Sequence, residues 1–254
     1  MKLIKKGLLD TWQGLPSFGL QHEGIPPGGA MDTFSLQIAN ALVGNDVYDK
    51  VLEMHFPAGV YQFETSTLLA ICGADFRACV DNVEVPLNQP IKVPPGAIFS
   101  CKKPVSGQRV YVATRTLHDE QVSRVKILPW SMNPENVFTD EPIRILCGRE
   151  WDQIKACSQQ CFLSRPFGIS PTSNRMGYQL IQEPLKTLAS QNLLSSAVTA
   201  GTIQLLPSGQ LVVLMAGHQT TGGYPRLAHV ISADLPRLAQ KGPGDSLRFT
   251  LTDS

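Results

Sequence analysis

Short apolar runs separated by turns that contain proline and glycine recur along nearly the whole chain. Turns of this kind lie at residues 93–96, 207–209 and 241–245. Runs of a few apolar residues bounded by such turns are typical of β-strands. The 254 residues include 19 prolines and 21 glycines, and because an interior proline breaks a helix, this proline density argues against a helical bundle or coiled coil. The pattern predicts a mainly β protein.

The predicted strands fall in both halves of the chain. They lie at residues 60–63, 68–72, 98–101, 109–113, 143–146, 202–205 and 211–215. Between the two sets, the stretch 114–141 is polar and irregular. We therefore expect an N-terminal β module with one helix at residues 1–115, an irregular connection at 116–140, and a C-terminal β module at 141–254.

Three short helices are expected to interrupt the strands. In the first, Asp32 is a good N-cap, apolar residues follow at helical spacing, and Gly44 ends the helix. The third is a short helix at 232–240, with Pro236 in its first turn. The second, at 151–161, carries apolar residues on one helical face, at positions 151, 154, 157 and 161.

The charges exclude several kinds of partner. Lys plus Arg number 22 and Asp plus Glu 21, so the formal net charge is +1, and no block of Lys or Arg stands out. This balance argues against a nucleic-acid or anionic-membrane surface. No apolar stretch approaches the roughly 18 residues that a membrane span needs, and the N-terminus does not read as a signal peptide. We expect a cytoplasmic protein without a membrane segment.

The cysteines lie mostly in apolar contexts, at positions 72, 79, 101, 147, 157 and 161. In a reducing compartment we expect them to be small core residues. Cys157 and Cys161 would share a helical face, but a zinc site needs two more soft ligands nearby, and no His or Cys cluster supplies them. No metal site is predicted.

Three segments carry residues suited to binding an anion. The first is the loop 24–32, where two prolines and two glycines precede the helix that Asp32 caps. Backbone amides exposed around Gly28 and Gly29 at a helix N-terminus favour a phosphate or a carboxylate. The alternative is a plain capped turn, in which Asp32 serves the helix alone.

The second segment, 173–178, contains Asn174 and Arg175, which together suit a planar anion such as a carboxylate. Its alternative is a surface turn with a solvated arginine. The third segment, 217–226, follows an apolar strand, at a position where loops carry function. Its side chains offer a cradle of donors and specific contacts, from Gln219, Thr220, Thr221, Tyr224 and Arg226.

No residue stands out as a catalytic base. His218 has no paired carboxylate in the sequence, and such a histidine is more often a hydrogen-bonded residue than an acid or base. The third segment lacks the lysine and the spacing of a P-loop, and neither a nucleophile elbow nor a zinc-protease motif occurs. From the residues alone, this is an anion-binding β protein, whether or not it is an enzyme.

Four stretches together carry a family resemblance. They read Gly-Ile-Pro-Pro-Gly-Gly-Ala-Met-Asp at 24–32, Ser-Asn-Arg-Met-Gly-Tyr at 173–178, Gln-Thr-Thr-Gly-Gly-Tyr-Pro-Arg at 219–226 and Val-Ile-Ser-Ala-Asp-Leu-Pro-Arg-Leu-Ala-Gln at 230–240. In order and wording they resemble the KipA family, also called allophanate hydrolase subunit 2 or the C subunit of 5-oxoprolinase. The resemblance covers residues 20–113 and 140–252.

The resemblance implies two cyclophilin-like β-barrel modules and a KipI-like partner, the B subunit, of the allophanate hydrolase subunit 1 family. With a third, LamB/YcsF-like subunit, such bacterial proteins form an ATP-dependent 5-oxoprolinase that hydrolyses 5-oxo-L-proline, a small acidic amide, to L-glutamate. On this interpretation ATP binds with or by the KipI-like partner. The substrate or its phosphorylated intermediate would be held by Asn40, Asn174, Arg175, Gln219, Thr220, Tyr224 and Arg226, with Asp32 orienting the first loop.

Two other functions remain as alternatives. One is a non-catalytic regulatory protein that binds and antagonises a KipI-like histidine-kinase inhibitor. The other is the carboxyltransferase half of a urea carboxylase-type enzyme, in which the carboxyl group arrives on biotin. Departures from the family pattern motivate the first, because this chain has no charge at Gly14, Ser17, Gln179 and Gly217. The hypothesis is that the fold and the partner interface survive these departures while catalysis is weakened or redirected.

Overall fold

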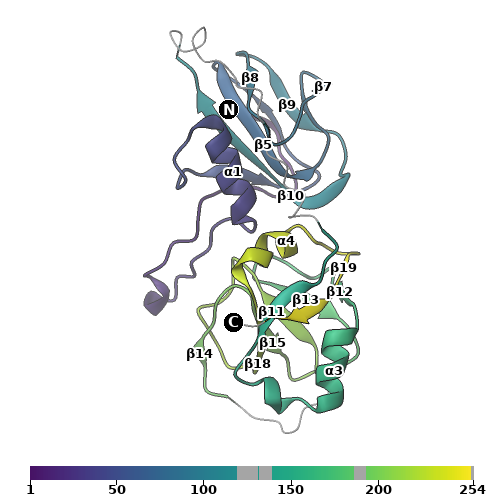
Figure 1. Cartoon of the computed structure of the whole chain (residues 1–254). Helices are drawn as coiled ribbons and strands as arrows, with labels where there is room; N and C mark the ends of the chain where they lie inside the picture. The colour runs from purple at the N-terminus through teal and green to yellow at the C-terminus, as the bar shows by residue number, and fades with distance from the viewer. Residues whose placement is uncertain (119–130, 132–138, 186–192, 253–254) are drawn as a thin grey trace. The chain divides into compact units, whose positions relative to one another are not determined.

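The computed structural model of the protein describes residues 1–118, 131, 139–185 and 193–252 (Figure 1). Strands predominate, and the mainly β fold class expected from the sequence is confirmed. The chain forms two compact units. The first unit comprises Met1–Leu15 and Asp32–Phe138, and the second comprises Pro16–Met31 and Thr139–Ser254.

The first unit contains two five-stranded sheets whose strand pairings are antiparallel. One sheet has the order β1 (Lys2–Lys5), β4 (Val60–Gln62), β9 (Ile98–Cys101), β6 (Ala78–Val80), β7 (Val83–Glu84). The other has the order β2 (Asp10–Gln13), β3 (Val51–Met54), β10 (Ser106–Thr116), β5 (Thr67–Asp75), β8 (Ile91–Val93). Each strand predicted in this half of the chain is present.

Helix α1 (Thr33–Val43) forms where the sequence predicts it, because both of its ends are capped. Asp32 accepts a hydrogen bond from the Ser35 backbone N–H at 2.8 Å, and Gly44 ends the helix in the left-handed region, at φ 72°. The apolar face of α1 packs against β5 and β10. Strand β5 is buried along nearly all of its length, which explains why its sequence is continuously apolar rather than alternating.

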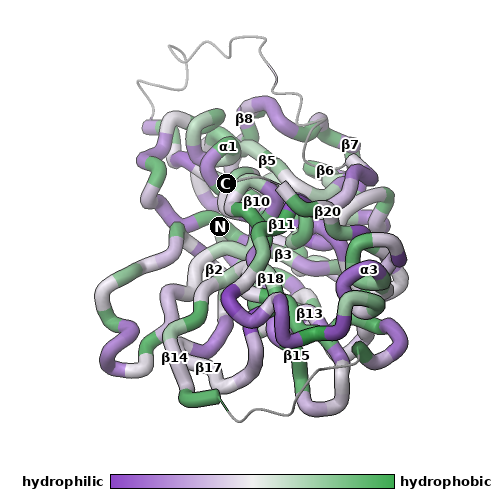
Figure 2. The backbone as a smooth tube through the Cα atoms, turned by 60° about the horizontal axis from the view of Figure 1, so that its bottom comes forward, coloured by the Kyte–Doolittle hydropathy of each residue, from purple (hydrophilic) through white to green (hydrophobic). Residues whose placement is uncertain are grey.

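The core of the first unit is filled by aromatic and branched side chains. Phe63, Phe76 and Phe99 are each 1% exposed or less, and they pack with Ile71 of β5 and Val112 of β10. Figure 2 follows the same pattern along the backbone, with hydrophobic residues recurring through β5 and β10. Burial of this kind is the main source of stability for such a sheet pair.

The second unit is built on an eight-stranded sheet. Its order is β19 (Ser246–Leu247), β12 (Phe167–Ile169), β13 (Gly177–Ile181), β16 (Leu211–Leu214), β15 (Thr202–Leu205), β18 (Arg226–Val230), β11 (Ile143–Cys147), β20 (Phe249–Leu251). The β11–β20 pairing is parallel, and the others are antiparallel. β14 (Ser196–Ala197) and β17 (Thr221–Gly222) form a separate two-stranded antiparallel ribbon.

Aromatic rings form the centre of the second core. The rings of Phe162 and Phe249 stack with centroids 5.1 Å apart, and both rings contact Phe167 at 5.4 Å. Trp151 meets Phe162 edge-on, also at 5.4 Å. These geometries are the favourable ones for aromatic pairs. The cluster joins helix α3 (Ala156–Ser164) to strands from opposite ends of the sheet order.

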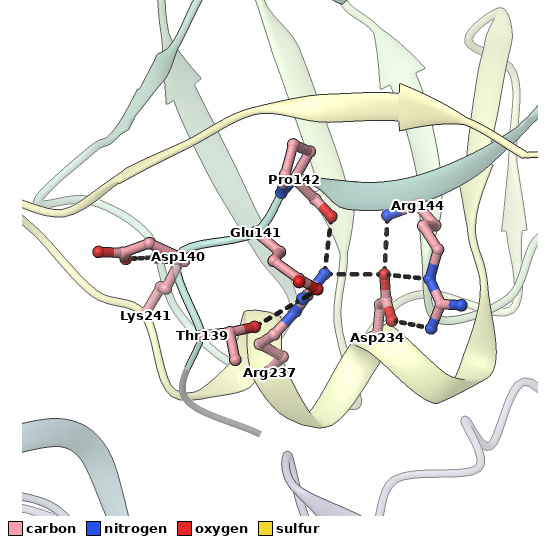
Figure 3. A network of polar contacts seen from close by, with 8 residues as sticks. All are labelled: Thr139, Asp140, Glu141, Pro142, Arg144, Asp234, Arg237 and Lys241. Atoms are coloured by element: carbon pink, nitrogen blue, oxygen red, sulfur yellow. Dashed lines mark hydrogen bonds and ion pairs between the residues drawn. The ribbon is translucent and has the colours of Figure 1, made fainter. Parts of the chain in front are cut away.

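The predicted helix at 232–240 is a 3-10 turn, η3 (Ser232–Asp234), followed by α4 (Leu235–Ala239). It carries a buried ionic network (Figure 3). Asp234 accepts hydrogen bonds from Arg144 at the start of β11 and from Arg237 of α4. Arg237 donates in addition to the Pro142 carbonyl at 2.7 Å and to Thr139. The network fastens residues 139–144, which lead into β11, to the helix.

The segment Pro16–Met31 groups with the second unit, whereas the expected division places it in the first module. Met31 is 4% exposed and belongs to the second core, and an Arg175 N–H donates to the Gly29 carbonyl. A boundary drawn along the sequence cannot anticipate such contacts, because they join residues far apart in the chain. The expected connection at 116–140 lies mostly outside the described residues.

The buried face of the predicted helix at 151–161 is shifted from the one expected. The segment forms a 3-10 turn, η2 (Trp151–Gln153), and then α3, and its buried residues are Ile154, Ser158 and Phe162. Cys157 and Cys161 lie beside this stripe and face a surface pocket, so the expected stripe through them is wrong. In the described part of the chain, no helix is long and apolar enough to cross a membrane.

The prediction that the cysteines are core residues holds only in the first unit. Cys72 and Cys79 are buried, Cys101 and Cys161 are partly buried, and the remaining two are exposed. Burial raises the pKa of the Cys72 thiol well above its usual range, so this residue stays an inert thiol. Cys147 is exposed because it ends β11, beyond the core that buries Ile143 and Ile145.

Candidate functional site

Arg175 connects the three predicted segments within the second unit. Its side chain donates a hydrogen bond to the Gly29 carbonyl of the first segment. Its own backbone carbonyl accepts from the Gly217 N–H of the third segment at 2.7 Å. Residues far apart in sequence, at positions 29, 175 and 217, therefore meet at one place, which the sequence pattern could only suggest.

The first segment is shaped by its glycines. Gly28 and Gly29 have φ values of 61° and 84°, in the left-handed region that favours glycine. This conformation turns the Gly29 carbonyl towards Arg175. The first segment therefore contributes a hydrogen-bond acceptor to Arg175, whereas the sequence predicted it to contribute backbone amide donors.

In the second segment, Asn174 shapes the turn. Its side-chain oxygen accepts from the Met176 N–H at 2.8 Å, and its N–H donates to the Gly177 carbonyl at 3.1 Å. This is the local hydrogen-bonding habit of asparagine in turns. Gly177 is needed here because a Cβ at this position would come within 2.7 Å of Val212. The turn thus positions Arg175, which directly follows Asn174.

The third segment is partly organised as strand. Thr221 pairs with Ala197 in the β14–β17 ribbon, and the Thr220 carbonyl accepts from the Val198 N–H at 3.2 Å. His218 is 3% exposed, and its Nδ1 lies 2.5 Å from the Gln219 carbonyl oxygen. A histidine with Nδ1 bonded to a carbonyl is held in one ring orientation. Tyr224, in contrast, is 43% exposed.

Arg226 is held by Glu150, a residue that the sequence analysis did not single out. The Arg226 N–H, Nε and Nη2 donate to the Glu150 carboxylate at 2.9, 3.0 and 2.8 Å, and Nη1 donates to Ser196 Oγ at 2.8 Å. The hydrogen bonds from Arg226 hold the pKa of the Glu150 carboxyl below its usual range. Arg226 is therefore a neutralised guanidinium in this structure and not an isolated positive charge.

Gln204 is a second residue that the sequence analysis missed. It lies on β15, is 2% exposed, and its Oε1 accepts weakly from Gln219 Nε2 at 3.4 Å. Its own Nε2 is a buried donor that has no hydrogen-bond partner among the described residues. Gly222 lies directly against this amide, because a Cβ there would approach Nε2 to 2.5 Å. Unsatisfied buried donors are rare and mark places where an acceptor belongs.

The available signal for Gln204 is its position as a polar residue in the apolar strand 202–205. Glu150 gives no such signal, since it follows β11 in an ordinary polar turn. Ser196 likewise becomes visible only through its contact with Arg226. All three lie beside the third segment without belonging to it.

Asp32 and Asn40 belong to the first unit, and their polar atoms serve the fold. The Asp32 carboxylate accepts from the Ser35 N–H and hydroxyl, which is the capped-turn alternative stated above. The Asp32 N–H donates to the Tyr111 hydroxyl at 2.8 Å. Asn40 is fully buried, and its amide donates to the Asp49 carbonyl at 2.7 Å, holding the loop after α1.

A separate pocket of about 190 Å³ lies in the second unit beside α3. Its lining includes Cys157, Cys161 and Phe167, and none of the predicted anion-binding residues contributes to it. Across residues 1–118, 139–185 and 193–252, no cluster of three or more His, Cys, Asp or Glu side chains is placed to hold a metal ion. In this part of the second unit, Arg175 and the buried Nε2 of Gln204 are the donors suited to an anion or an amide oxygen.

The fold and these segments define a class of protein. The sequence pattern of the family described as carboxyltransferase domain, subdomain A and B, matches residues 23–122 and 116–251, so the chain belongs to this family. It is 33% identical to the C subunit of 5-oxoprolinase from Escherichia coli, over 98% of this chain and 90% of that protein. The corresponding protein of Haemophilus influenzae is 30% identical, over 94% of this chain and 87% of that protein. The family resemblance read from the sequence is confirmed.

Longer proteins contain a similar domain. The urea amidolyase of Saccharomyces cerevisiae is 27% identical over 91% of this chain, which spans 15% of that protein. Crystal structures of TTHA0988 and of the Kluyveromyces lactis urea amidolyase match with TM-scores of 0.83 and 0.86, at 24% and 22% identity. The chain spans 55% and 18% of these two structures, respectively, and the likeness to them shows the fold.

Proposed function

We propose that this chain is a subunit of an ATP-dependent 5-oxoprolinase-type amide hydrolase, which converts 5-oxo-L-proline to L-glutamate in the cytoplasm. It acts with a KipI-like partner protein and a LamB/YcsF-like third subunit. The observation that carries the proposal is the match to the C subunit of 5-oxoprolinase at 33% identity, which extends over 98% of this chain and 90% of the relative. Because the match covers nearly all of both chains, it compares whole subunits and not a single shared domain.

The chemistry of the site agrees with a small acidic amide. Such a substrate presents a carboxylate and a ring amide oxygen, both of which accept hydrogen bonds. Arg175 suits the carboxylate, because a guanidinium binds carboxylates through two parallel N–H donors. The unpartnered Gln204 amide, 2% exposed, supplies a donor for the amide oxygen once the third segment opens to admit it.

In this proposal ATP is bound with or by the KipI-like partner. One contact supports that placement. Glu150 occupies Arg226 with a bidentate ion pair, so this guanidinium is not available to bind a phosphate. A nucleotide site completed by the partner is consistent with this contact.

The test is reconstitution of the three subunits with 5-oxo-L-proline and ATP, measuring glutamate released. We expect glutamate that requires both ATP and this chain, and about tenfold or greater loss of turnover per active complex for Arg175→Ala. The matched control is Arg165→Ala, an exposed arginine outside the three segments. No glutamate above a mixture lacking this chain would refute the proposal. A stable complex without turnover would favour the regulatory alternative.

A second candidate has its own observation. The similarity to urea amidolyases, at 27% identity over 91% of this chain, favours the carboxyltransferase half of a biotin-dependent enzyme. The assay is transfer of the carboxyl group from carboxybiotin to urea by the same complex. Transfer without 5-oxo-L-proline hydrolysis would select this function over the first.

A further inference from the structure

The segment 16–31 is a closed loop with a defined tip. Figure 1 draws it as a two-armed extension that ends in a short helical turn, which is η1 (Gln21–Glu23). A hydrogen bond from the Ser17 N–H to the Pro27 carbonyl, at 2.9 Å, joins the two arms. Compact loops whose ends are close together frequently carry function.

Hydrogen bonds within the tip hold its shape. The Glu23 and Ile25 N–H groups donate to the Leu20 carbonyl at 3.0 and 3.3 Å, and the Gly19 N–H donates to Gln21 Oε1 at 2.8 Å. Gly24 closes the turn at φ 79°, a conformation that favours glycine. A loop ordered by its own bonds loses little further entropy when it binds.

The tip exposes large apolar side chains. Phe18 is 73% exposed, Leu20 46% and Ile25 47%. Beside them, His22 Nε2 and Glu23 Oε1 lie 3.5 Å apart. Clustered apolar side chains on an ordered loop mark an interaction site more often than scattered ones do.

The base of the loop is anchored at the candidate site. Met31 is buried in the second core, and the Gly29 carbonyl accepts from Arg175. The return arm from Gly24 to Gly29 therefore runs directly from the apolar tip to Arg175. Anything that binds the tip touches the same short arm that positions the predicted anion ligand.

A protein partner fits this tip better than a small molecule does. The relatives that this chain matches nearly end to end are named as subunits of 5-oxoprolinase. In TTHA0988 and in urea amidolyase the equivalent domain occupies 55% and 18% of a longer chain, so there it is joined to further protein. Apolar anchors that enter a partner's pocket are the usual centre of such interfaces.

We propose that the tip of segment 16–31 docks into an apolar groove of the KipI-like partner, with Phe18, Leu20 and Ile25 as anchors. This rests on the proposed function in taking the chain to be a subunit and its partner to be KipI-like. Docking fixes the Gly24–Gly29 arm and with it Arg175, so that the partner completes the substrate site. The sequence departure at Ser17 lies at the neck of this loop.

The experiment measures the Kd between the full chain and the purified KipI-like partner by isothermal titration calorimetry. We expect the double substitution Phe18→Ser, Leu20→Ser to raise Kd about tenfold or more, since hot-spot anchors have effects of this size. The matched control is Val105→Ser, which alters an equally apolar residue, 55% exposed, in a turn of the first unit. Circular dichroism confirms that all variants keep the wild-type β content.

The outcomes separate docking from catalysis. Arg175→Ala should lose turnover and weaken binding less than the tip variant does, because the hydrogen bonds within the loop remain and the apolar anchors are kept. Weakened binding of the tip variant alone supports docking, even if the wild-type complex has no 5-oxoprolinase activity. Unchanged Kd for the tip variant, or no binding of the wild-type chain to the KipI-like partner, overturns it. A dimer of the free chain that the tip substitutions dissociate also overturns it, because the occupant would then be a second copy.

Discussion

Two buried carboxylates of the second unit are held by arginine in the same way. Asp234 receives the backbone N–H, Nε and Nη2 of Arg144, at 2.7, 3.2 and 2.7 Å. Glu150 receives the same three groups of Arg226, at 2.9, 3.0 and 2.8 Å. In both pairs an arginine in the first two residues of a strand binds a carboxylate from elsewhere in the chain through its main chain and its side chain together.

The surroundings of the two pairs differ. Asp234 has a second arginine, Arg237, whose remaining donors reach the Thr139 hydroxyl and the Pro142 carbonyl (Figure 3). Both arginine partners of Asp234 lie on regular elements of the fold, Arg144 on β11 and Arg237 on α4. Among the described residues, the Arg226 side chain bonds to Glu150 and the hydroxyl of Ser196 alone, and it ends the third predicted segment beside exposed Tyr224.

This difference separates a structural network from an adaptable one. The run 230–240 is the longest part of the family resemblance, yet its Asp234 and Arg237 fasten the chain leading into β11. The shorter run 219–226 ends at an arginine that, in the described part of the chain, has a single carboxylate partner. The length of a motif therefore does not show whether its charged residues bind a ligand. The number of partners that these residues already have within the fold is the better guide.

The largest effect is expected from Asp234→Ala. It leaves Arg237, whose side chain is 8% exposed, without its buried carboxylate, and breaking such a buried pair costs about 3–5 kcal/mol of unfolding free energy. Urea denaturation measures the loss. Arg144→Ala is the comparison variant and should cost less, because its side chain is 49% exposed and Asp234 keeps Arg237. A loss for Asp234→Ala below about 1 kcal/mol, the size of an ordinary hydrogen bond, would contradict the structural role.

Glu150→Gln should have an intermediate effect. The substitution keeps the shape of the side chain but removes the charge that neutralises Arg226, and we expect a loss of about 2 kcal/mol, as for hydrogen bonds to charged groups. Arg226→Lys is the matched variant, which keeps the positive charge and removes the bidentate geometry. The same urea titration measures both. A Glu150→Gln loss as large as that of Asp234→Ala would erase the distinction between the two networks.

Acid should weaken both networks, because it protonates their carboxylates. The loss of unfolding free energy should be no larger than the losses caused by Asp234→Ala and Glu150→Gln, which remove the same charges. Arginine hydrogen bonds lower the pKa of Glu150, and those of Arg144 together with the charge of Arg237 outweigh burial at Asp234 and lower its pKa as well. A lowered pKa in the folded state stabilises the protein above the unfolded pKa, near about 4, and this stability is lost as pH falls through the folded value. In a urea series run from neutral to strongly acidic pH, the midpoints should therefore fall most once the pH drops below about 4.

The control for this pH series is Glu150→Gln, whose acid loss should be smaller than that of wild type because one of the two arginine-held carboxyls with a lowered pKa is gone. Parallel curves for the two proteins would show that Glu150 does not contribute. Salt should change the wild-type curve little, since buried pairs are weakly screened.

The smallest effect is expected from Arg165→Ala. Arg165 pairs with Glu183 at 3.0 Å, but the two side chains are 59% and 87% exposed. Exposed pairs of this kind contribute about 0.2–1 kcal/mol or nothing measurable. The urea midpoint should lie close to that of wild type, which also makes this variant a suitable control for the activity assay. A loss comparable to that of Glu150→Gln would mean that burial does not rank these pairs.

Local features of the fold were predictable. The strands, the Asp32 cap and the Gly44 end of α1 follow from side-chain periodicity and from hydrogen bonds within three residues. The predictions failed where burial depended on distant packing. Cys147 follows an apolar run in the sequence, yet it is exposed, because position along a strand decides which side chains reach the core.

The candidate site was predictable only in part. The sequence identified Arg175 and Arg226 as the arginines of the predicted anion-binding segments, since their residue types and neighbours suffice for that. It did not identify Glu150, which lies 76 positions from Arg226, or the buried amide of Gln204. Pairing of charges across such separations depends on strand order, which no short stretch of sequence encodes.

By itself the sequence determined the β class, the capped helix and the family, because these rest on patterns among residues close together in the chain. Only the tertiary structure decided that residues 16–31 group with the second unit, that Glu150 neutralises Arg226, and that Asp234 belongs to a structural network. The reason is physical: burial and charge pairing are properties of the space around a side chain, and that space is filled by residues from distant parts of the chain.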